Sequence, residues 1–389
     1  MTPIQDSLRR LFKPVDPIPA GTYHYIAPPD DPRNYRLHLR VEPGGRGVLL
    51  VNAATVLHLN QTATEYAYYL IQNLPEDQVV NKINARYHVD KNTALAHYRD
   101  FVERIDTLVT TPDLDPVTFL DFDRQEPFTG EISAPYRLDC ALTYRLPQPY
   151  PPGDAPEDRV TRELDTQEWL QILDTAWQAG IPHIVFTGGE PTLRDDLVEL
   201  LAHAEGNSQV TGLLTDGLRL AEPDYLEALL QTGLDHLMIL LQPEQDQAWQ
   251  ALKNALAADL FVAVHFTITP ENYQEVPTWL GQVAELGVKT VSLTASGEAM
   301  FPYLDEAREK ASLLDMELAW NLPVPYSAWN PVQLETERKE YAAGSGRAWM
   351  YVEPDGDVLP AQGLNRVLGN LLTDPWQKIW EAGQLTEQA

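Results

Sequence analysis

The chain has 389 residues, and its 57 acidic against 28 basic side chains give a formal net charge of −29. This charge argues against a nucleic-acid surface, which needs clustered Lys and Arg, and against binding to an anionic membrane. With 44% hydrophobic residues the sequence is too apolar for intrinsic disorder, and its length predicts two or three domains.

The chain contains one cysteine, Cys140. A single thiol cannot form an internal disulfide, an all-thiolate zinc site or a thiolate-held iron–sulfur cluster. No apolar run reaches the roughly 18 residues that span a membrane. The N-terminal segment lacks the long apolar stretch and the small-residue cleavage site of a signal peptide. We therefore expect a cytoplasmic protein.

Residues 1–20 are expected to form a tail, and residues 21–110 predict a small α+β domain. Its expected strands are Tyr35–Val41, Gly47–Val51 and Thr55–Leu59, and its expected helices are Thr62–Gln72, Glu76–Tyr87 and Asn92–Val109. Three strands followed by three short helices are typical of a winged-helix-like domain. A helix-turn-helix DNA-binding domain is the ordinary alternative, and the net charge disfavours it.

Residues 111–135 are acidic and proline-bearing, and they predict a linker. Strands and helices alternate after it. The expected strands are Leu138–Tyr144, His183–Thr187, Val210–Leu214, His236–Leu241, Phe261–Ile268 and Thr290–Thr294. The first expected helix begins after Asp165, which forms a capping box with Glu168. The later expected helices are Arg194–Glu205, Glu222–Gln231, Gln245–Ala258, Asn272–Leu286 and Pro302–Leu314. Six such units predict an α/β fold over residues 136–325, with parallel strands, helices outside and a turn-rich extension over 326–389.

Polar residues follow several of the expected strands, at the edge where parallel sheets place their functional sites. They occur in Thr187-Gly188-Gly189-Glu190-Pro191, in Thr215-Asp216-Gly217, at Gln242, and at Thr267 and Thr269. Two glycines allow a ligand close to the backbone, and a carboxylate beside them binds an ammonium group. Ordinary strand-to-helix turns explain each segment equally well when it is taken alone.

Taken together, the segments resemble one family. IVFTGGEPTLRDDLVELLAHA, GLLTDGLRL, GLDHLMILLQP and HFTITPENYQEVPTWL resemble successive units of radical S-adenosylmethionine (SAM) enzymes, nearest to the peptide-modifying members of pyrroloquinoline quinone maturation. PDGDVLPAQGLNRVLGNLLTDPWQKIW resembles the end of their C-terminal SPASM-type extension. GVLLVNAATVLHLNQTATEYAYYLIQ resembles the PqqD-like leader-peptide recognition domain of the same pathway.

The resemblance implies a partial (β/α)6 barrel, a [4Fe–4S] cluster held by three cysteines after the first strand, and SAM bound beside it. The implied SAM-binding residues are Gly188, Gly189, Glu190, Pro191, Thr215, Asp216, Gln242 and Thr267, with Glu190 at the amino group. The resemblance also implies a leader or precursor peptide on the N-terminal domain and a partner maturase.

The sequence departs from the family at the cluster motif. Aligned on Leu142-Thr143-Tyr144-Arg145, the three cysteine positions carry Leu146, Tyr150 and Gly153. If Cys140 is aligned as the first ligand instead, Tyr144 and Pro147 stand at the other two positions, and Ala361 stands where the family's extension has a cysteine. Apolar and hydroxyl groups do not replace thiolates on iron, so we expect no [4Fe–4S] cluster. Tyr150 is hypothesised to fill the cluster cavity.

Three functions remain open from the sequence. The first is a peptide-binding pseudoenzyme or scaffold, and the second is an enzyme that uses SAM or another small ligand without a cluster. The third is an active radical SAM peptide maturase with non-standard cluster ligation. No His-based metal site is expected, because the nine histidines show no HxxH or HExxH spacing. Trp320, Trp329 and Trp349 are candidates for a peptide groove or, alternatively, for a packed domain interface.

Overall fold

The computed structural model describes residues 15–28, 30–33, 35–52, 55–111, 132–147, 153–258, 260–337 and 342–384. The chain forms two compact units, one within residues 1–132 and the other within residues 133–389. Most of the expected linker, the first part of the expected N-terminal tail and Tyr150 lie outside the described residues.

The first unit contains a four-stranded antiparallel sheet in the order β1-β2-β3-β4. Its strands are β1 (Gly21–Ile26), β2 (Arg36–Val41), β3 (Gly47–Val51) and β4 (Thr55–Leu59). The last three agree with the predicted strands to within one residue. Strand β1 was not predicted, because its residues are partly buried or exposed and include no run of aliphatic side chains.

Three helices follow this sheet, α2 (Gln61–Ile71), α3 (Glu76–Tyr87) and α4 (Lys91–Thr110). Helix α2 packs on the strands, α4 packs on α2, and α3 packs on α4. Asn60 and Asp90 cap α2 and α4 through their side-chain oxygens, which accept hydrogen bonds from free backbone N–H groups at the helix starts. Alternate residues of β2 and β3 pack with one face of each helix in a single apolar core, which includes Leu39, Leu49 and Phe101. The third helix agrees with the predicted range Asn92–Val109 to within one residue at each end.

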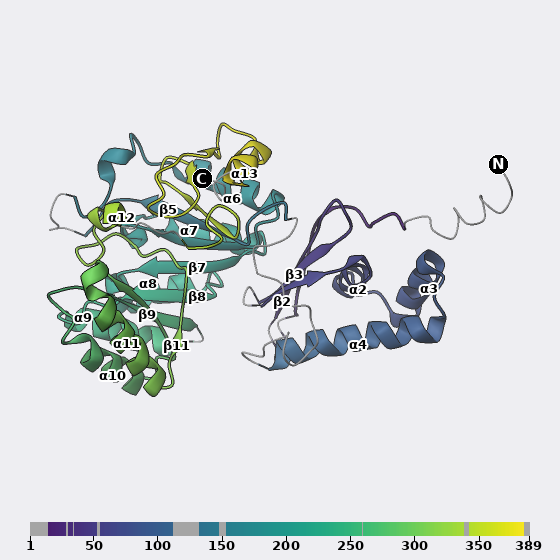
Figure 1. The fold of residues 1–389 in the computed structure, drawn as a ribbon, viewed down its shortest axis with the longest axis horizontal. Helices are drawn as coiled ribbons and strands as arrows, with labels where there is room; N and C mark the ends of the chain where they lie inside the picture. The colour runs from purple at the N-terminus through teal and green to yellow at the C-terminus, as the bar shows by residue number, and fades with distance from the viewer. Residues whose placement is uncertain are drawn as a thin grey trace. The chain divides into compact units, whose positions relative to one another are not determined.

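The second unit is built on a ten-stranded sheet in the order β11-β10-β9-β8-β7-β6-β5-β12-β13-β14. Six strands run parallel and in sequence order: β5 (Arg137–Thr143), β6 (His183–Gly188), β7 (Val210–Thr215), β8 (His236–Leu240), β9 (Phe261–Ile268) and β10 (Thr290–Ala295). This confirms the prediction of a parallel α/β sheet. Figure 1 shows these strands in teal to green with their helices outside the sheet.

The helices of the six units are α6 (Thr166–Gln178), α7 (Leu197–Gly206), α8 (Pro223–Leu230), α9 (Asp246–Leu256), α10 (Val276–Glu285) and α11 (Phe301–Leu313). Asp165 and Glu168 form the predicted capping box, and α6 buries the expected face, including Trp169 and Ile172. The helix expected from Arg194 starts only at Leu197, because a 3₁₀ turn at Pro191–Leu193 precedes it. Similarly, the helix expected from Asn272 starts at Val276, after a turn in which Asn272 accepts from Thr269 N.

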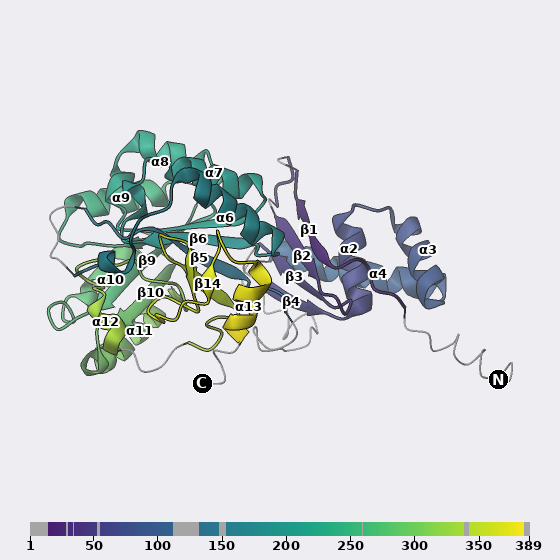
Figure 2. The same ribbon diagram turned by 90° about the horizontal axis from the view of Figure 1, so that it is seen from above.

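The C-terminal segment joins the same sheet, which the sequence analysis did not predict. β12 (Trp349–Val352) pairs in parallel with β5, and β13 (Asp357–Leu359) and β14 (Gly369–Asn370) continue the sheet in antiparallel fashion. Figure 2 shows this yellow segment beside β5, ending in α13 (Trp376–Gln384). Strand β11 (Glu317–Leu318) forms the opposite edge of the sheet. The short helix α12 (Gln333–Glu337) lies between β11 and β12 in the sequence. Along the described part of the chain, no helix has the length and apolar character needed to cross a membrane.

Candidate functional site

The carboxyl ends of neighbouring strands in the second unit open into one cavity of about 360 Å³. Its walls come from the segments that follow β5, β6, β7 and β8, and a later segment, residues 325–329, completes the lining. The volume lies within the range of roughly 300–1,000 Å³ that is typical of small-molecule sites. Four predicted residues line it: Gly189, Glu190, Asp216 and Gln242.

Glu190 follows β6, and its carboxylate joins two neighbouring turns. One oxygen, Oε1, accepts hydrogen bonds from Thr192 N (2.9 Å), Thr192 Oγ1 (2.5 Å) and Thr215 Oγ1 (2.7 Å). The other oxygen, Oε2, accepts from Asp216 N at 2.7 Å. The side chain is only 2% exposed. Four hydrogen bonds therefore fix the position of this buried carboxylate.

Asp216 follows β7 and lies beside Glu190 on the same wall of the cavity. Its Oδ1 accepts a hydrogen bond from Leu218 N at 2.9 Å. Burial, followed by the negative charge of Glu190, raises the pKa of Asp216 to about 8. A carboxyl group in this environment holds its proton at neutral pH because two adjacent buried carboxylates repel each other.

The two glycines of the predicted motif allow a close approach of two backbone segments. A Cβ atom on Gly188 would lie 2.2 Å from Thr143 O, and one on Gly189 would lie 2.4 Å from Arg145 O. Gly188 also has a φ of +132°, which disfavours residues with a side chain. Gly189 N donates to Thr143 O at 2.8 Å, so the glycines hold the turn after β6 against the end of β5.

The other predicted residues stand further from the cavity. Thr215 supports Glu190 from behind, and Pro191 begins the 3₁₀ turn that follows it. Thr267 lines a much smaller adjoining cavity, where its hydroxyl lies 3.0 Å from His265 Nε2. Direct contact of these residues with a ligand stays a prediction.

The segment after β5 carries apolar side chains where the family motif has its first cysteine. Leu146 is 6% exposed and packs in an apolar cluster with Tyr144, Tyr326 and Ala155. The rings of Tyr144 and Tyr326 meet edge to face, with centroids 5.4 Å apart. Leu146 and Tyr326 also line the cavity, so this wall is apolar and aromatic.

A buried polar network supports the same wall. Tyr144 donates to Glu353 Oε1 at 2.9 Å, and Arg159 pairs with both Glu353 (3.2 Å) and Glu335 (2.8 Å). Tyr326 donates to Glu335. Burial raises the pKa of Tyr144 well above its usual range, so this tyrosine stays protonated and acts as a donor.

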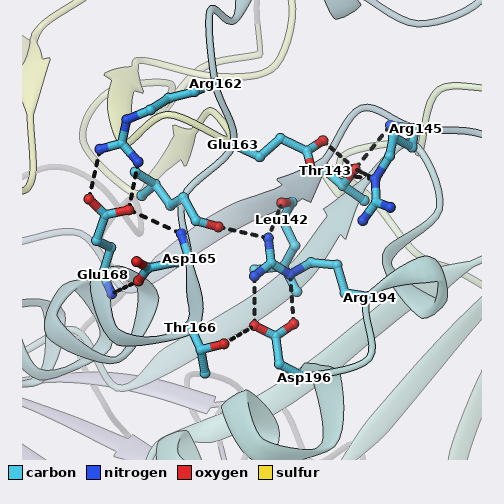
Figure 3. Close-up of polar contacts among 11 residues, drawn as sticks. Leu142, Thr143, Arg145, Arg162, Glu163, Asp165, Thr166, Glu168, Arg194 and Asp196 are labelled. Atoms are coloured by element: carbon cyan, nitrogen blue, oxygen red, sulfur yellow. Dashed lines mark hydrogen bonds and ion pairs between the residues drawn. The ribbon is translucent and has the colours of Figure 1, made fainter.

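Figure 3 shows a second network, which fixes the end of β5 to its neighbours. Arg194 donates to Leu142 O (3.2 Å) and Leu164 O (3.0 Å), and its guanidinium pairs with Asp196 at 2.6 Å. Thr166, at the start of α6, donates to Asp196 at 2.7 Å. Arg194 and Asp196 therefore hold three separate segments of the chain together.

The residues around the end of β5 do not fit an iron–sulfur cluster. Leu146 is buried among aromatic rings, and Gly153 has no side chain to donate. Cys140 lies inside β5. Burial raises the pKa of its thiol well above the usual range, and the negative charge of Asp139 adds a smaller upward shift. Among the described residues, no group of three His, Cys, Asp or Glu side chains is placed to hold a metal ion.

The sequence analysis missed part of the cavity lining. Tyr326 and Gln245 were not singled out, and Trp329 was considered only for a peptide groove or an interface. Tyr326 and Trp329 come from a turn-rich segment far along the chain, where no local pattern indicates which strand ends they cover. Trp349 is buried under Arg137, whose guanidinium lies 5.5 Å from the ring centroid, and Trp320 is exposed beside Arg308.

Comparison with known proteins gives a consistent set of relatives. Residues 140–282 match the model of the radical SAM superfamily. The PqqA peptide cyclase of Gluconobacter oxydans is 31% identical over 254 residues, which cover 59% of this chain and 70% of the cyclase. The PqqA peptide cyclase of Methylorubrum populi is 30% identical over 288 residues, which cover 64% of this chain and 73% of the cyclase.

Among solved structures, Streptococcus suis SuiB bound to its precursor peptide SuiA superposes with a TM-score of 0.57 and 15% identity, covering 92% of this chain and 88% of SuiB. SuiB bound to S-adenosylmethionine superposes with a TM-score of 0.56 and 14% identity, over the same shares of the two chains. At these identities the likeness shows a shared fold alone.

Proposed function

This chain belongs to the radical SAM superfamily, and we propose that it serves ribosomal-peptide maturation as a peptide-binding pseudoenzyme or scaffold that builds no iron–sulfur cluster. The observation that carries the proposal is the wall after β5. Leu146 stands at the first cluster position and packs in one apolar cluster with Tyr144 and Tyr326, and the whole chain has one thiol, buried inside a strand. Three thiolates are needed to hold a [4Fe–4S] cluster with one open iron.

The proposed domain assignment is based on the resemblance of successive segments of the sequence to peptide-modifying radical SAM enzymes. Residues 1–20 are a tail, 21–110 a PqqD-like peptide-recognition domain, and 111–135 an acidic linker. Residues 136–325 form the radical-SAM-like partial barrel, and residues 326–389 form a SPASM-like extension. In this assignment, the leader or precursor peptide binds the recognition domain, and a partner maturase supplies the radical chemistry that this chain does not perform.

The recognition domain has a groove suited to an extended peptide. β4 is an outer strand of its sheet, and a cavity of about 460 Å³ lies between the end of β4, the start of α2 and α4. Tyr66 and Phe101 contribute aromatic rings with centroids 6.1 Å apart, and His97, Asp100 and Arg104 contribute polar groups. An extended peptide beside an outer strand gains main-chain hydrogen bonds, and such a groove receives alternate side chains.

Peptide binding is tested with the short peptides encoded beside this gene, titrated against the full chain. Ala63 lines the groove and is partly exposed, so Ala63→Arg fills the groove without entering the core. Ala85 is exposed on α3 away from the groove, and Ala85→Arg is its matched control. We expect Ala63→Arg to weaken binding by about tenfold or more and Ala85→Arg to leave it unchanged. A complete peptide set without any binding contradicts the proposal.

The absence of a cluster is tested by anaerobic reconstitution followed by iron and sulfide assays. We expect neither element above background. Iron and sulfide in cluster stoichiometry contradict the proposal and restore the alternative of an active radical SAM peptide maturase with non-standard ligation.

A second candidate function is favoured by the cavity itself. Gly189, Glu190, Asp216 and Gln242 were predicted as SAM-binding residues, and all four line one cavity of suitable size. In this candidate, the protein binds SAM without a cluster, with Glu190 and Asp216 facing its cationic groups. Calorimetric titration of SAM, with iron assayed on the same sample, tests it. We expect Glu190→Gln to weaken binding by about tenfold, and the exposed Glu227→Gln to leave it unchanged.

A further inference from the structure

Two histidines from strands that are not neighbours meet at the amino-terminal edge of the parallel sheet. His183 is the first residue of β6 and His236 is the first residue of β8, and β7 lies between these strands. Their Nε2 atoms are 3.4 Å apart, and their rings meet at 72° with centroids 4.9 Å apart. The cavity described above lies at the carboxyl ends of the same strands, so the histidine pair is a separate feature.

Gly212, on β7, makes this meeting possible. It is the register partner of His236, and a Cβ atom on it would lie 2.1 Å from His236 Nε2. Any side chain at this position would therefore occupy the space of the His236 ring. A glycine inside a strand often marks such a close approach. The ring of His236 thus lies over β7 and reaches His183.

The separation of the two nitrogens fits a shared metal ion better than a hydrogen bond. N–H donors in proteins typically lie about 2.7–3.2 Å from their acceptors, which is shorter than the 3.4 Å found here. Zn²⁺ binds imidazole nitrogen at about 2.0–2.1 Å. Two nitrogens that are 3.4 Å apart and at that distance from one ion subtend an angle of about 110°, close to the tetrahedral angle that Zn²⁺ prefers.

The charges around the pair are compatible with a metal ion. Burial, followed by the positive charge of Arg137, lowers the pKa of His236 to about 4, so its imidazole is neutral at pH 7. A metal ion needs this neutral form, because protons compete for the same nitrogen. Arg137 also repels a metal ion, but its guanidinium pairs with Asp139 at 2.7 Å, which offsets that repulsion. Both histidines are partly exposed, so the pair lies near the protein surface.

We propose that His183 and His236 bind one divalent transition-metal ion of the zinc class through their Nε2 atoms, with water as the remaining ligands. Imidazole nitrogen is a preferred ligand of such ions. Among the described residues no third His, Cys, Asp or Glu side chain completes the set, so the ion keeps water ligands. The ion joins β6 to β8 across β7. Because the two ligands are 53 residues apart, no local histidine spacing indicates them.

The proposal is tested by calorimetric titration of Zn²⁺ into the full chain at neutral pH, after treatment with a chelator. We expect one saturable site in the unaltered protein. His183→Gln and His236→Gln should each weaken it by at least about tenfold, because even the loss of an outer-shell partner costs a metal site that much. His203→Gln is the matched control. It removes a second pair of zinc-binding groups, since His203 Nε2 lies 2.7 Å from Asp174, and it should leave the affinity unchanged.

Thermal unfolding provides a second measurement, which needs no altered ligand. An ion that binds only the folded protein raises the midpoint of unfolding as its concentration rises. We expect this rise in the unaltered protein and in His203→Gln, but not in His183→Gln, whose folding is checked by circular dichroism. If His236→Gln does not fold, His183→Gln decides alone.

Three results would overturn the proposal. They are the absence of saturable Zn²⁺ binding, unchanged affinity in either folded variant of the pair, and loss of binding in His203→Gln. The first two results would mean that His183 and His236 form only a hydrogen bond, and the third would place the ion at Asp174 and His203 instead.

Discussion

The two walls of the cavity differ in what holds them. The turns after β6, β7 and β8 carry Glu190, Asp216 and Gln242, and the first two are joined by hydrogen bonds. The wall after β5 presents Leu146 and Pro147 beside Tyr326, and apolar packing holds it together with buried polar networks behind it. In the polar wall, the Glu190 carboxylate accepts hydrogen bonds from Thr192, Thr215 and Asp216 N. Two neighbouring walls of one cavity can therefore be built by different interactions.

Removal of Arg194 is the strongest test of how the β5 wall is held. Arg194→Ala removes the ion pair of Asp196, which keeps its hydrogen bond from Thr166, and it removes the donor to two carbonyl groups. We expect the free energy of unfolding to fall by about 3–5 kcal/mol in urea titrations. The exposed pair of Arg162 with Glu168 is the matched control, and Arg162→Ala should cost less than about 1 kcal/mol. Equal costs for the two variants would mean that the buried network does not hold the wall.

Truncation of Leu146 tests the packing that replaces the first cluster ligand. Leu146→Ala leaves a void in the apolar cluster that contains Tyr144 and Tyr326, and we expect it to lower the free energy of unfolding by about 3 kcal/mol. Leu313 is 78% exposed, so Leu313→Ala should change stability by less than about 0.5 kcal/mol. A cost below that of the control would show that Leu146 is not packed.

Thr215→Val tests the polar wall. It removes the bond from Thr215 Oγ1 to Glu190 and the acceptor for Gly217 N at 3.0 Å, so we expect a loss of about 2 kcal/mol in stability. SAM affinity should fall as well, because Glu190 loses one of the donors that fix it. If Thr215→Val lowered stability but left SAM affinity unchanged in calorimetry, the hydrogen bond from Thr215 to Glu190 would not contribute to ligand binding.

Tyr144→Phe is the corresponding test of the β5 wall and has the smallest expected effect. It removes the hydrogen bond to Glu353, which keeps Arg159 as its partner, and we expect a loss of about 1.5 kcal/mol. SAM affinity should stay the same, because Tyr144 lies behind Leu146 and Tyr326 and does not line the cavity. A drop in affinity equal to that of Thr215→Val would contradict the division into two walls.

Apolar spacing and helix-capping residues predicted the elements whose bounds depend on residues close in the sequence. β9 has the predicted bounds, and the apolar spacing together with the Asp165 capping box gave both the start and the buried face of α6. Two glycines and a carboxylate after a strand likewise indicated the polar wall. β12, in contrast, pairs with a strand far along the chain, and short-range patterns do not encode such pairing.

The same limit applies to the site. Thr267 follows its strand just as Thr215 does, yet its hydroxyl lies beside His265, and no sequence pattern distinguishes the two threonines. Tyr326 and Trp329 reach the cavity only because the chain returns to it after β11. Which side chain covers which strand end is decided by tertiary packing.

The pairing of β12 with β5 has a consequence for synthesis of the protein. Arg137 and Trp349 are register partners although more than 200 residues separate them. During translation, the edge of β5 therefore stays unpaired until almost the whole second unit has left the ribosome. Unpaired strand edges are sites of aggregation, and non-local pairing slows folding. The nascent chain is thus exposed to aggregation through the edge of β5 during most of the synthesis of the second unit.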